Sequence, residues 1–217
     1  MSIGSPSDGP IRFEVWSDFL CPWCYVAAVR LGKLESDYDG EIKLVWRTYL
    51  LQPVARPKPI DRFMAYTRRW VAPGGPSDAE PQCGFRPWLE HDDPPPSHSV
   101  PPAVAGKIAH RYGKSEFDRF HLATMRAYFV DHRTVSEADV LTDIAASCGL
   151  PRQAFADQLT NESAALAIEV ADEHRRGVEA EVLAVPSVVV NGFPIPGAQD
   201  LDVYRRMIDR LIARSTS

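Results

Sequence analysis

Long apolar runs are missing from this sequence, and no stretch approaches the ~18–20 residues that a membrane-spanning helix needs. An excess of basic residues is missing too, because 24 Lys and Arg stand against 29 Asp and Glu, for a net charge of −5. Phosphate binding needs a basic face, so neither nucleic acid nor a membrane is expected as a partner. The N-terminal stretch lacks a basic segment followed by an apolar one, so we expect no secretory signal and a cytoplasmic protein.

Cysteine is scarce, with four in 217 residues: Cys21, Cys24, Cys83 and Cys148. These spacings are not those of a small secreted domain held together by disulfides. A structural zinc site pairs one CxxC with a second CxxC or with two nearby histidines. Cys83 and Cys148 stand alone, and no two histidines lie three to five residues apart. We therefore expect no metal site.

Strand patterns occupy the two ends of the chain. Residues 11–17 alternate apolar and polar side chains, residues 22–38 repeat apolar side chains at helical spacing, and a second strand begins at 41. This order predicts a right-handed βαβ unit. Near the other end, a β-branched run leads into Asn191-Gly192, a strong hairpin signal, and residues 200–213 read as an amphipathic helix.

The middle of the chain predicts helix and loop only. Helices are expected at about 103–112, 115–131, 137–148, 151–160 and 162–181. Residues 71–102 are rich in Pro, Gly and acidic side chains, which predicts a long irregular loop or a mobile cover. Its neighbours Lys107 and Arg111, one turn apart, are interpreted as a solvated helix face, and His98, His110 and His121 as ordinary helix or loop histidines.

The segment "SDFLCPWCYVA" carries the pattern most typical of chemistry, with Cys21 and Cys24 at the expected start of a helix. Residues i and i+3 share one side of a helix, and the free N–H groups and dipole at its start stabilise a thiolate at Cys21. Cys24, one turn in, should be buried and remain a thiol, while Pro22 fixes the first turn and Trp23 shields the sulfur. One exposed nucleophile and one resolving thiol suit dithiol exchange.

Two other interpretations of the pair exist. The first is that the two cysteines form half of a zinc site, but the sequence offers no further ligands at the required spacing. The second is that they are two thiols packed in the core, but such thiols would not require Pro22 or a position between a strand and a helix. Asp18, three residues before Cys21, is a candidate proton acceptor or source of electric field for the pair, and equally an acid placed by the helix dipole. Pro186 directly precedes a β-branched strand, where trans is the ordinary isomer and cis the alternative.

CPWC at a helix start, a helical insert, and Val-Pro before a hairpin and a last helix resemble the thioredoxin-fold DsbA superfamily. The segments "SDFLCPWCYVA", "WRTYLLQP", "AYFVDHRTVSEADVLTDIAASCGL" and "VPSVVVNGFPIPGAQ" are similar, in order, to its FrnE-like branch. The resemblance implies an α/β thioredoxin fold (βαβ…ββα) with a large all-helical insertion. The expected parts are a flexible tail (1–10), the first half of the thioredoxin fold (11–53), the insertion with its Pro-rich loop 71–102 (54–181), and the second half (182–217).

The resemblance also implies that Pro186 is cis and lies against the cysteine pair, with Cys21 attacking and Cys24 resolving. The backbone of Val185 would then pair with substrate as an added strand. Two residues depart from the family pattern. The CPWC dipeptide lacks the histidine of the periplasmic oxidant, and Ala184 stands where this branch usually has glycine.

The expected function is therefore that of a thiol–disulfide oxidoreductase acting on protein or small-molecule thiols and disulfides. Glutathione and the thioredoxin system are candidate partners, and no cofactor is expected beyond the Cys21–Cys24 disulfide. One rival is a glutathione-dependent isomerase or transferase of the same fold, of the kappa-class or hydroxychromene-carboxylate isomerase type. Those enzymes use serine at the position of Cys21, which counts against this rival. A second rival is a non-enzymatic polypeptide-binding chaperone with an apolar groove.

Overall fold

A four-stranded mixed sheet in the order β2-β1-β3-β4 organises the protein in this computed structural model, which describes residues 9–90 and 92–215. Most of the tail expected over residues 1–10 lies outside these described residues. Strands β1 (Ile11–Ser17) and β2 (Ile42–Thr48) pair in parallel over their whole length. Strand β3 (Ser187–Val190) runs antiparallel to β1, and β4 (Phe193–Pro196) antiparallel to β3. The predicted βαβ unit and hairpin are thus confirmed.

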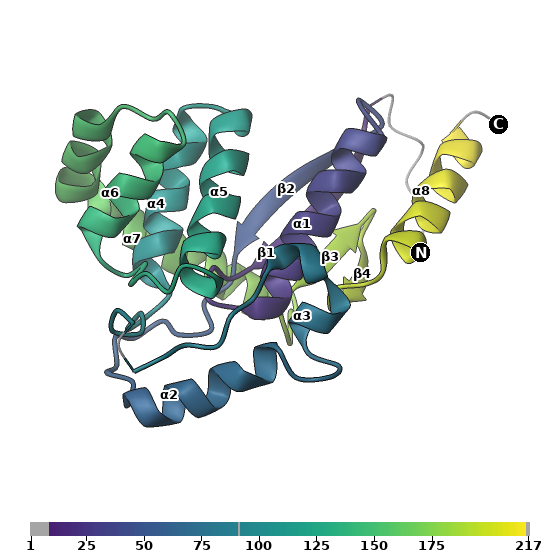
Figure 1. Ribbon diagram of the computed structural model, residues 1–217. Helices are drawn as coiled ribbons and strands as arrows, with labels where there is room; N and C mark the ends of the chain where they lie inside the picture. The colour runs from purple at the N-terminus through teal and green to yellow at the C-terminus, as the bar shows by residue number, and fades with distance from the viewer. Residues whose placement is uncertain (1–8, 91, 216–217) are drawn as a thin grey trace.

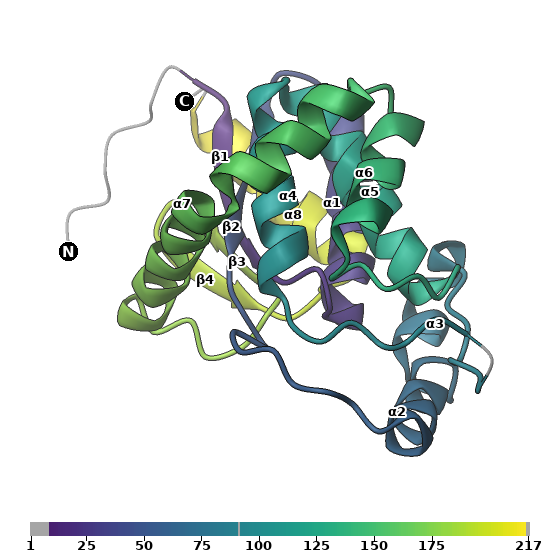
Figure 2. The ribbon, with the colours of Figure 1, turned by 90° about the vertical axis from the view of Figure 1, so that its left-hand side faces the viewer.

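Helices surround this sheet unevenly (Figure 1). The helices are α1 (Pro22–Asp37), α2 (Ile60–Thr67), α3 (Pro76–Ala79), α4 (Val100–Arg111), α5 (Lys114–Phe129), α6 (Ala138–Ser147), α7 (Arg152–Glu179) and α8 (Leu201–Ser215), with 3-10 turns η1 (Arg68–Trp70) and η2 (Pro81–Cys83). Helices α4 to α7 gather on one side of the sheet, and α2 lies apart at the bottom of the view. In Figure 2, α7 runs from beside α6 to the strands. Within the described residues, no helix is both long and apolar enough to cross a membrane.

Helix α7 corrects one prediction, because a single helix replaces the two expected at 151–160 and 162–181. Asn and Ser around the expected break are weak helix formers. Burial of Leu159 and Leu166 on either side overrides that preference. The Ser163 hydroxyl donates to the Leu159 carbonyl, one turn earlier in the same helix.

The segment expected to be a long loop, 71–102, is partly ordered. It contains α3 and η2, and α4 begins at Val100, earlier than predicted, with two prolines in its first turn where proline is tolerated. Cys83, Phe85 and Trp88 are all buried. This segment therefore contributes to the core, and the alternative of a mobile cover is wrong for these residues.

Two apolar clusters form the core, and α1 belongs to both. The first joins the sheet to α1 and α8 and includes Phe13, Leu31 and Ile208. The second fills the helical insertion and includes Cys24 and Met125. Because α1 connects the clusters, its N-terminal turn lies where the sheet meets the insertion.

Candidate active site

The first turn of α1 holds both cysteines of the CPWC segment. Cys21 is the N-cap residue with an extended backbone (φ −94°, ψ 117°), and its carbonyl accepts from the N–H groups of Cys24 at 3.0 Å and Tyr25 at 3.2 Å. The Val185–Pro186 peptide bond is cis. The Cys21 thiol donates to the Val185 carbonyl across 3.5 Å. Two segments far apart in sequence therefore meet at one sulfur, as the family resemblance implies.

The two thiols differ in chemistry more than in exposure. Cys21 is 5% exposed and Cys24 is 0% exposed, so the expectation of an exposed nucleophile is wrong for this conformation. The hydrogen bond from the Cys24 thiol outweighs burial and lowers the pKa of Cys21. Burial, reinforced by the bond to Cys21, raises the pKa of Cys24 well above its ordinary value. All four cysteines of the chain are free thiols in this structure.

Asp18 is buried directly behind the pair, with 2% exposure. Its carboxylate accepts from the N–H groups of Leu20 at 2.6 Å and Leu51 at 2.7 Å, and its own N–H points at the Cys24 sulfur at 3.5 Å. Burial raises the pKa of Asp18 despite these bonds. Its negative charge in turn acts to raise the pKa of Cys21. The effect of the Asp18 charge on the Cys21 pKa is what a source of electric field would produce. The deep burial of Asp18 is not typical of an acid placed at a helix start by the helix dipole alone.

Two residues near the pair were missed by sequence reasoning. Lys58 is half-buried, and its buried Nζ has no hydrogen-bond partner within the described part of the chain. Burial lowers the pKa of Lys58 to about 8, while the charge of Asp18 opposes that shift. Tyr66 comes from α2, which no sequence pattern indicated, and burial together with the charge of Cys21 raises its pKa. The sequence did not predict the position of Lys58, because a lysine between two prolines is typical of an exposed loop.

The remaining candidate residues have simpler surroundings. Pro22 is buried in the first turn, and Trp23 is 36% exposed at the surface beside the pair. Cys83 is buried near Glu80, and burial raises the pKa of this thiol to about 12. Cys148 lies half-buried at the end of α6. Among the described residues, no group of three or more His, Cys, Asp or Glu is arranged to hold a metal ion.

Known proteins share this architecture. The chain is 23% identical over 199 residues to the uncharacterized protein YwbO of Bacillus subtilis (strain 168), covering 91% of this chain and 96% of that one. A putative protein disulfide isomerase from Nitrosomonas europaea superposes with a TM-score of 0.76 at 15% identity, covering 94% of this chain and 98% of the other. The cytosolic disulfide reductase DsbM from Pseudomonas aeruginosa with GSH superposes with a TM-score of 0.61 at 19% identity, covering 94% and 96%.

A family model matches most of the chain. The model describes a DSBA-like thioredoxin domain, and it matches residues 12–72 and 104–209. The matched parts contain all of the sheet except Ile11, the cysteine pair and the cis proline, while the unmatched interval 73–103 falls mainly in the proline-rich segment. This chain therefore belongs to the DSBA-like thioredoxin domain family.

Proposed function

We propose that this protein is a thiol–disulfide oxidoreductase in which Cys21 exchanges disulfides with a substrate and Cys24 resolves the mixed disulfide. The observation that carries this proposal is the geometry of the pair: Cys21 caps α1 beside the cis Pro186, 3.5 Å from the Val185 carbonyl, and Cys24 is fully buried one turn in. The directions of the two pKa shifts, down at Cys21 and up at Cys24, agree with this division of roles. The thiolate is the reactive form of cysteine. A pair with one acidic and one protected thiol therefore attacks through the first and holds the second in reserve.

Reduction of a substrate disulfide by the dithiol takes two exchange steps. The Cys21 thiolate attacks one sulfur of the substrate disulfide, the S–S bond breaks, and one substrate thiolate leaves. Cys24 loses its proton and attacks the Cys21 sulfur, which breaks the mixed disulfide and releases the second substrate thiolate. The substrate gains two electrons, and the enzyme is left with a Cys21–Cys24 disulfide. Oxidation of a substrate dithiol is the same sequence in reverse.

Substrate backbone is positioned by the cis-proline segment. The Val185 carbonyl accepts only a long S–H contact from Cys21, at 3.5 Å. A thiolate cannot donate that bond, so ionisation of Cys21 frees the carbonyl. An extended substrate segment then pairs with the backbone at Val185 as an added strand, which supplies affinity with little sequence preference.

Glutathione is the small-molecule partner that the comparisons favour. DsbM, a cytosolic disulfide reductase solved with GSH, shares this fold over 94% of the chain. A thiol pool of that kind, in the cytoplasm, would return the Cys21–Cys24 disulfide to the dithiol after each turnover. The isomerase rival would instead bind glutathione without any change in the redox state of Cys21.

Trapping of the mixed disulfide tests the assignment of roles. Cys24→Ser should accumulate a stable mixed disulfide with oxidised glutathione, because no resolving thiol remains. Cys21→Ser should accumulate none, because burial keeps Cys24 protonated. Both variants are made in a Cys148→Ser background, since half-buried Cys148 is the other accessible thiol. Equal adduct formation by both variants would overturn the assignment, and undiminished binding of unfolded protein by Cys21→Ser would favour the chaperone.

A further inference from the structure

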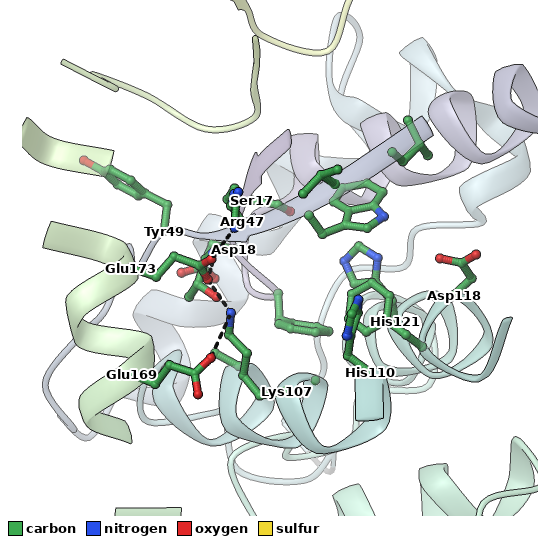
Figure 3. A pocket seen from close by; sticks show the side chains of 18 of the residues that line it. Ser17, Asp18, Arg47, Tyr49, Lys107, His110, Asp118, His121, Glu169 and Glu173 are labelled. Carbon is green, nitrogen blue, oxygen red and sulfur yellow. Dashed lines mark hydrogen bonds and ion pairs between the residues drawn. The ribbon is translucent and has the colours of Figure 1, made fainter. Parts of the chain in front are cut away.

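A cavity of about 700 Å³ lies on the far side of Asp18 from the cysteine pair, enclosed by β2, α4, α5 and α7 (Figure 3). Its lining includes Ser17 at the end of β1 and Asp18 and Phe19 of the following loop, but neither Cys21 nor Cys24. The exchange chemistry does not use this space. Its volume falls within the roughly 300–1,000 Å³ of typical small-molecule pockets.

One wall of the cavity is aromatic. The ring of His121, on α5, has its centroid 4.5 Å from that of Trp46, 5.0 Å from that of Phe19 and 5.3 Å from that of Phe117. These separations are typical of favourable aromatic packing, at roughly 4.5–7 Å. The four rings come from β2, the loop after β1 and α5, so the wall is built jointly by the sheet and the helical insertion.

His121 is a polar side chain in this wall that lacks a polar partner. It is 4% exposed, its ring faces the cavity in Figure 3, and within the described residues its contacts are ring contacts only. Burial lowers the pKa of His121 to about 3, so the ring is neutral and presents one N–H donor and one nitrogen acceptor. His121 thus lies on a helix, as expected, and turns a ring with hydrogen-bonding capacity toward the cavity.

The opposite wall carries charge. Glu173, on α7, has a 5% exposed side chain and accepts from Lys107 at 2.5 Å, from the Thr48 N–H at 2.9 Å and from Arg47 at 3.4 Å. Lys107 thus belongs to a cavity wall, which corrects its expected place on a solvated face. The lining holds seven cations and four carboxylates: Arg12, Lys43, Arg47, Lys107, Arg111, Lys114 and Arg176, and Asp18, Asp118, Glu169 and Glu173. Beyond the lining, Glu14 pairs with Arg12 and Arg47, Glu162 with Arg111, and Glu35 with Lys114.

Lys43 and Arg176 are the two lining cations that have no carboxylate partner among the described residues. Charges of one sign along a low-dielectric cleft raise the local concentration of ions of the opposite sign. A cavity with an aromatic wall, a neutral imidazole and two cations without ion-pair partners is complementary to a flat molecule that carries negative charge.

We propose that this cavity binds a small aromatic carboxylate, with its rings against Trp46 and Phe19, a hydrogen bond to His121, and its carboxylate toward Lys43 or Arg176. An occupant so placed contacts the same loop that leads to Cys21. The proposal does not depend on which thiol attacks, so it can fail while the exchange chemistry holds.

Titration of the full-length protein with 2-naphthoate tests the proposal by calorimetry. We expect saturable binding at one site, weaker binding of 2-naphthylmethanol, and the weakest binding of 2-naphthylmethylamine, because the three probes share one ring system and differ in charge. His121→Phe keeps an aromatic ring and removes both nitrogens. It should weaken naphthoate binding about tenfold, the value of one hydrogen bond of about 1.4 kcal/mol.

Two further variants test the site and the charge. Lys43→Gln, in the cavity lining, should weaken binding, whereas Lys33→Gln, on the exposed surface of α1, should not. Cys21→Ser should bind the probe as the unmodified protein does. In the unmodified protein, naphthoate should shift the ring resonances of His121 and leave those of His98 in place, which tests the site even where a variant does not fold.

Each of four results would overturn the proposal. These are no saturable naphthoate binding, unchanged affinity in His121→Phe, equal affinity for the amine and the carboxylate, and loss of binding in Cys21→Ser. The last result would place the probe at the cysteine pair instead of the cavity.

Discussion

The two sulfurs of the CPWC segment are one helical turn apart, and their surroundings separate their chemistry. Cys24 is enclosed by the core of the helical insertion, where a thiolate finds no solvation. The Cys21 thiol lies against the Val185 carbonyl and forms a hydrogen bond with the Cys24 thiol. The charge of Asp18 acts on Cys21 from behind, and the charge of Lys58 acts on Asp18, so substitutions at these two positions should change reactivity and stability in predictable directions.

Asp18→Asn should lower the pKa of Cys21, because the negative charge of Asp18 acts to raise it. The variant should also lose about 1–3 kcal/mol of stability, since an amide cannot accept from both Leu20 and Leu51. Thiolate absorbance followed against pH measures the first effect. Asp39→Asn, at an exposed acid away from the pair, is the matched control and should leave the Cys21 pKa unchanged. A Cys21 pKa that rises or stays constant in Asp18→Asn would contradict the electrostatic account.

Lys58→Met should stabilise the protein at neutral pH, and the advantage should shrink as pH rises from about 8 to about 10.5. Burial lowers the pKa of Lys58 from 10.5 to about 8. Between those values the folded state binds fewer protons than the unfolded state, so the free energy of unfolding of the unmodified protein rises with pH. Urea denaturation of both proteins across this interval measures the difference. A gap independent of pH would show that Lys58 is not held in an unfavourable environment.

Among the elements, α7 depends on one glycine for its approach to the sheet. A Cβ at Gly177 would lie 2.7 Å from Cζ3 of Trp16, on β1, a separation that side chains do not tolerate. Helix α7 can therefore lie against the sheet only with glycine at this position. Gly32, in the middle of α1, has no atom within 4 Å of the corresponding Cβ position.

Gly177→Ala should destabilise the protein by about 1–3 kcal/mol, because α7 or Trp16 must move. Gly32→Ala makes the same chemical change in open space and should stabilise by about 0.5–1 kcal/mol, through helix propensity alone. Denaturant midpoints of the two variants against the unmodified protein measure both effects. If both substitutions moved the denaturant midpoint in the same direction, the close contact between α7 and β1 would not be limiting the packing.

Local patterns predicted the elements whose structure is decided locally. Alternation gave β1, and Asn191-Gly192 gave the hairpin, whose two turn residues have φ of 50° and 82°. The unbroken α7 was missed because the burial of Leu159 and Leu166 is decided by tertiary packing. Helix α2, with Tyr66, was missed because prolines at 57 and 59 mark a loop. The cavity around His121 could not be predicted, since its walls come from elements that meet only in three dimensions.

At the scale of the whole molecule, Glu173 joins the sheet to the helical insertion. Its carboxylate binds Arg47 and the Thr48 N–H on β2 and also Lys107 on α4. Although burial acts to raise it, the hydrogen bond from Lys107 keeps the pKa of Glu173 below its ordinary value. The ionised Glu173 carboxylate thus accepts from two donors in the sheet and one in the helical insertion.

Glu173→Ala should lower the free energy of unfolding by about 2 kcal/mol, because it removes the acceptor of the Thr48 N–H and the carboxylate nearest to Lys107. Glu169→Ala, one turn earlier on the same helix, removes a carboxylate 54% exposed and 3.8 Å from Lys107. It should cost at most about 1 kcal/mol. Urea denaturation compares the two variants, and similar losses would show that the Glu173 network does not hold the parts together.

The central claim, that Cys21 and Cys24 form a functional redox couple, is tested most directly by equilibrium titration of the protein against glutathione redox buffers. We predict one reversible two-electron couple, in which a tenfold change of the equilibrium constant corresponds to about 30 mV. It should be absent in Cys21→Ser and preserved in Cys83→Ser. No reversible couple in the unmodified protein, or a couple that survives in Cys21→Ser, would contradict the account.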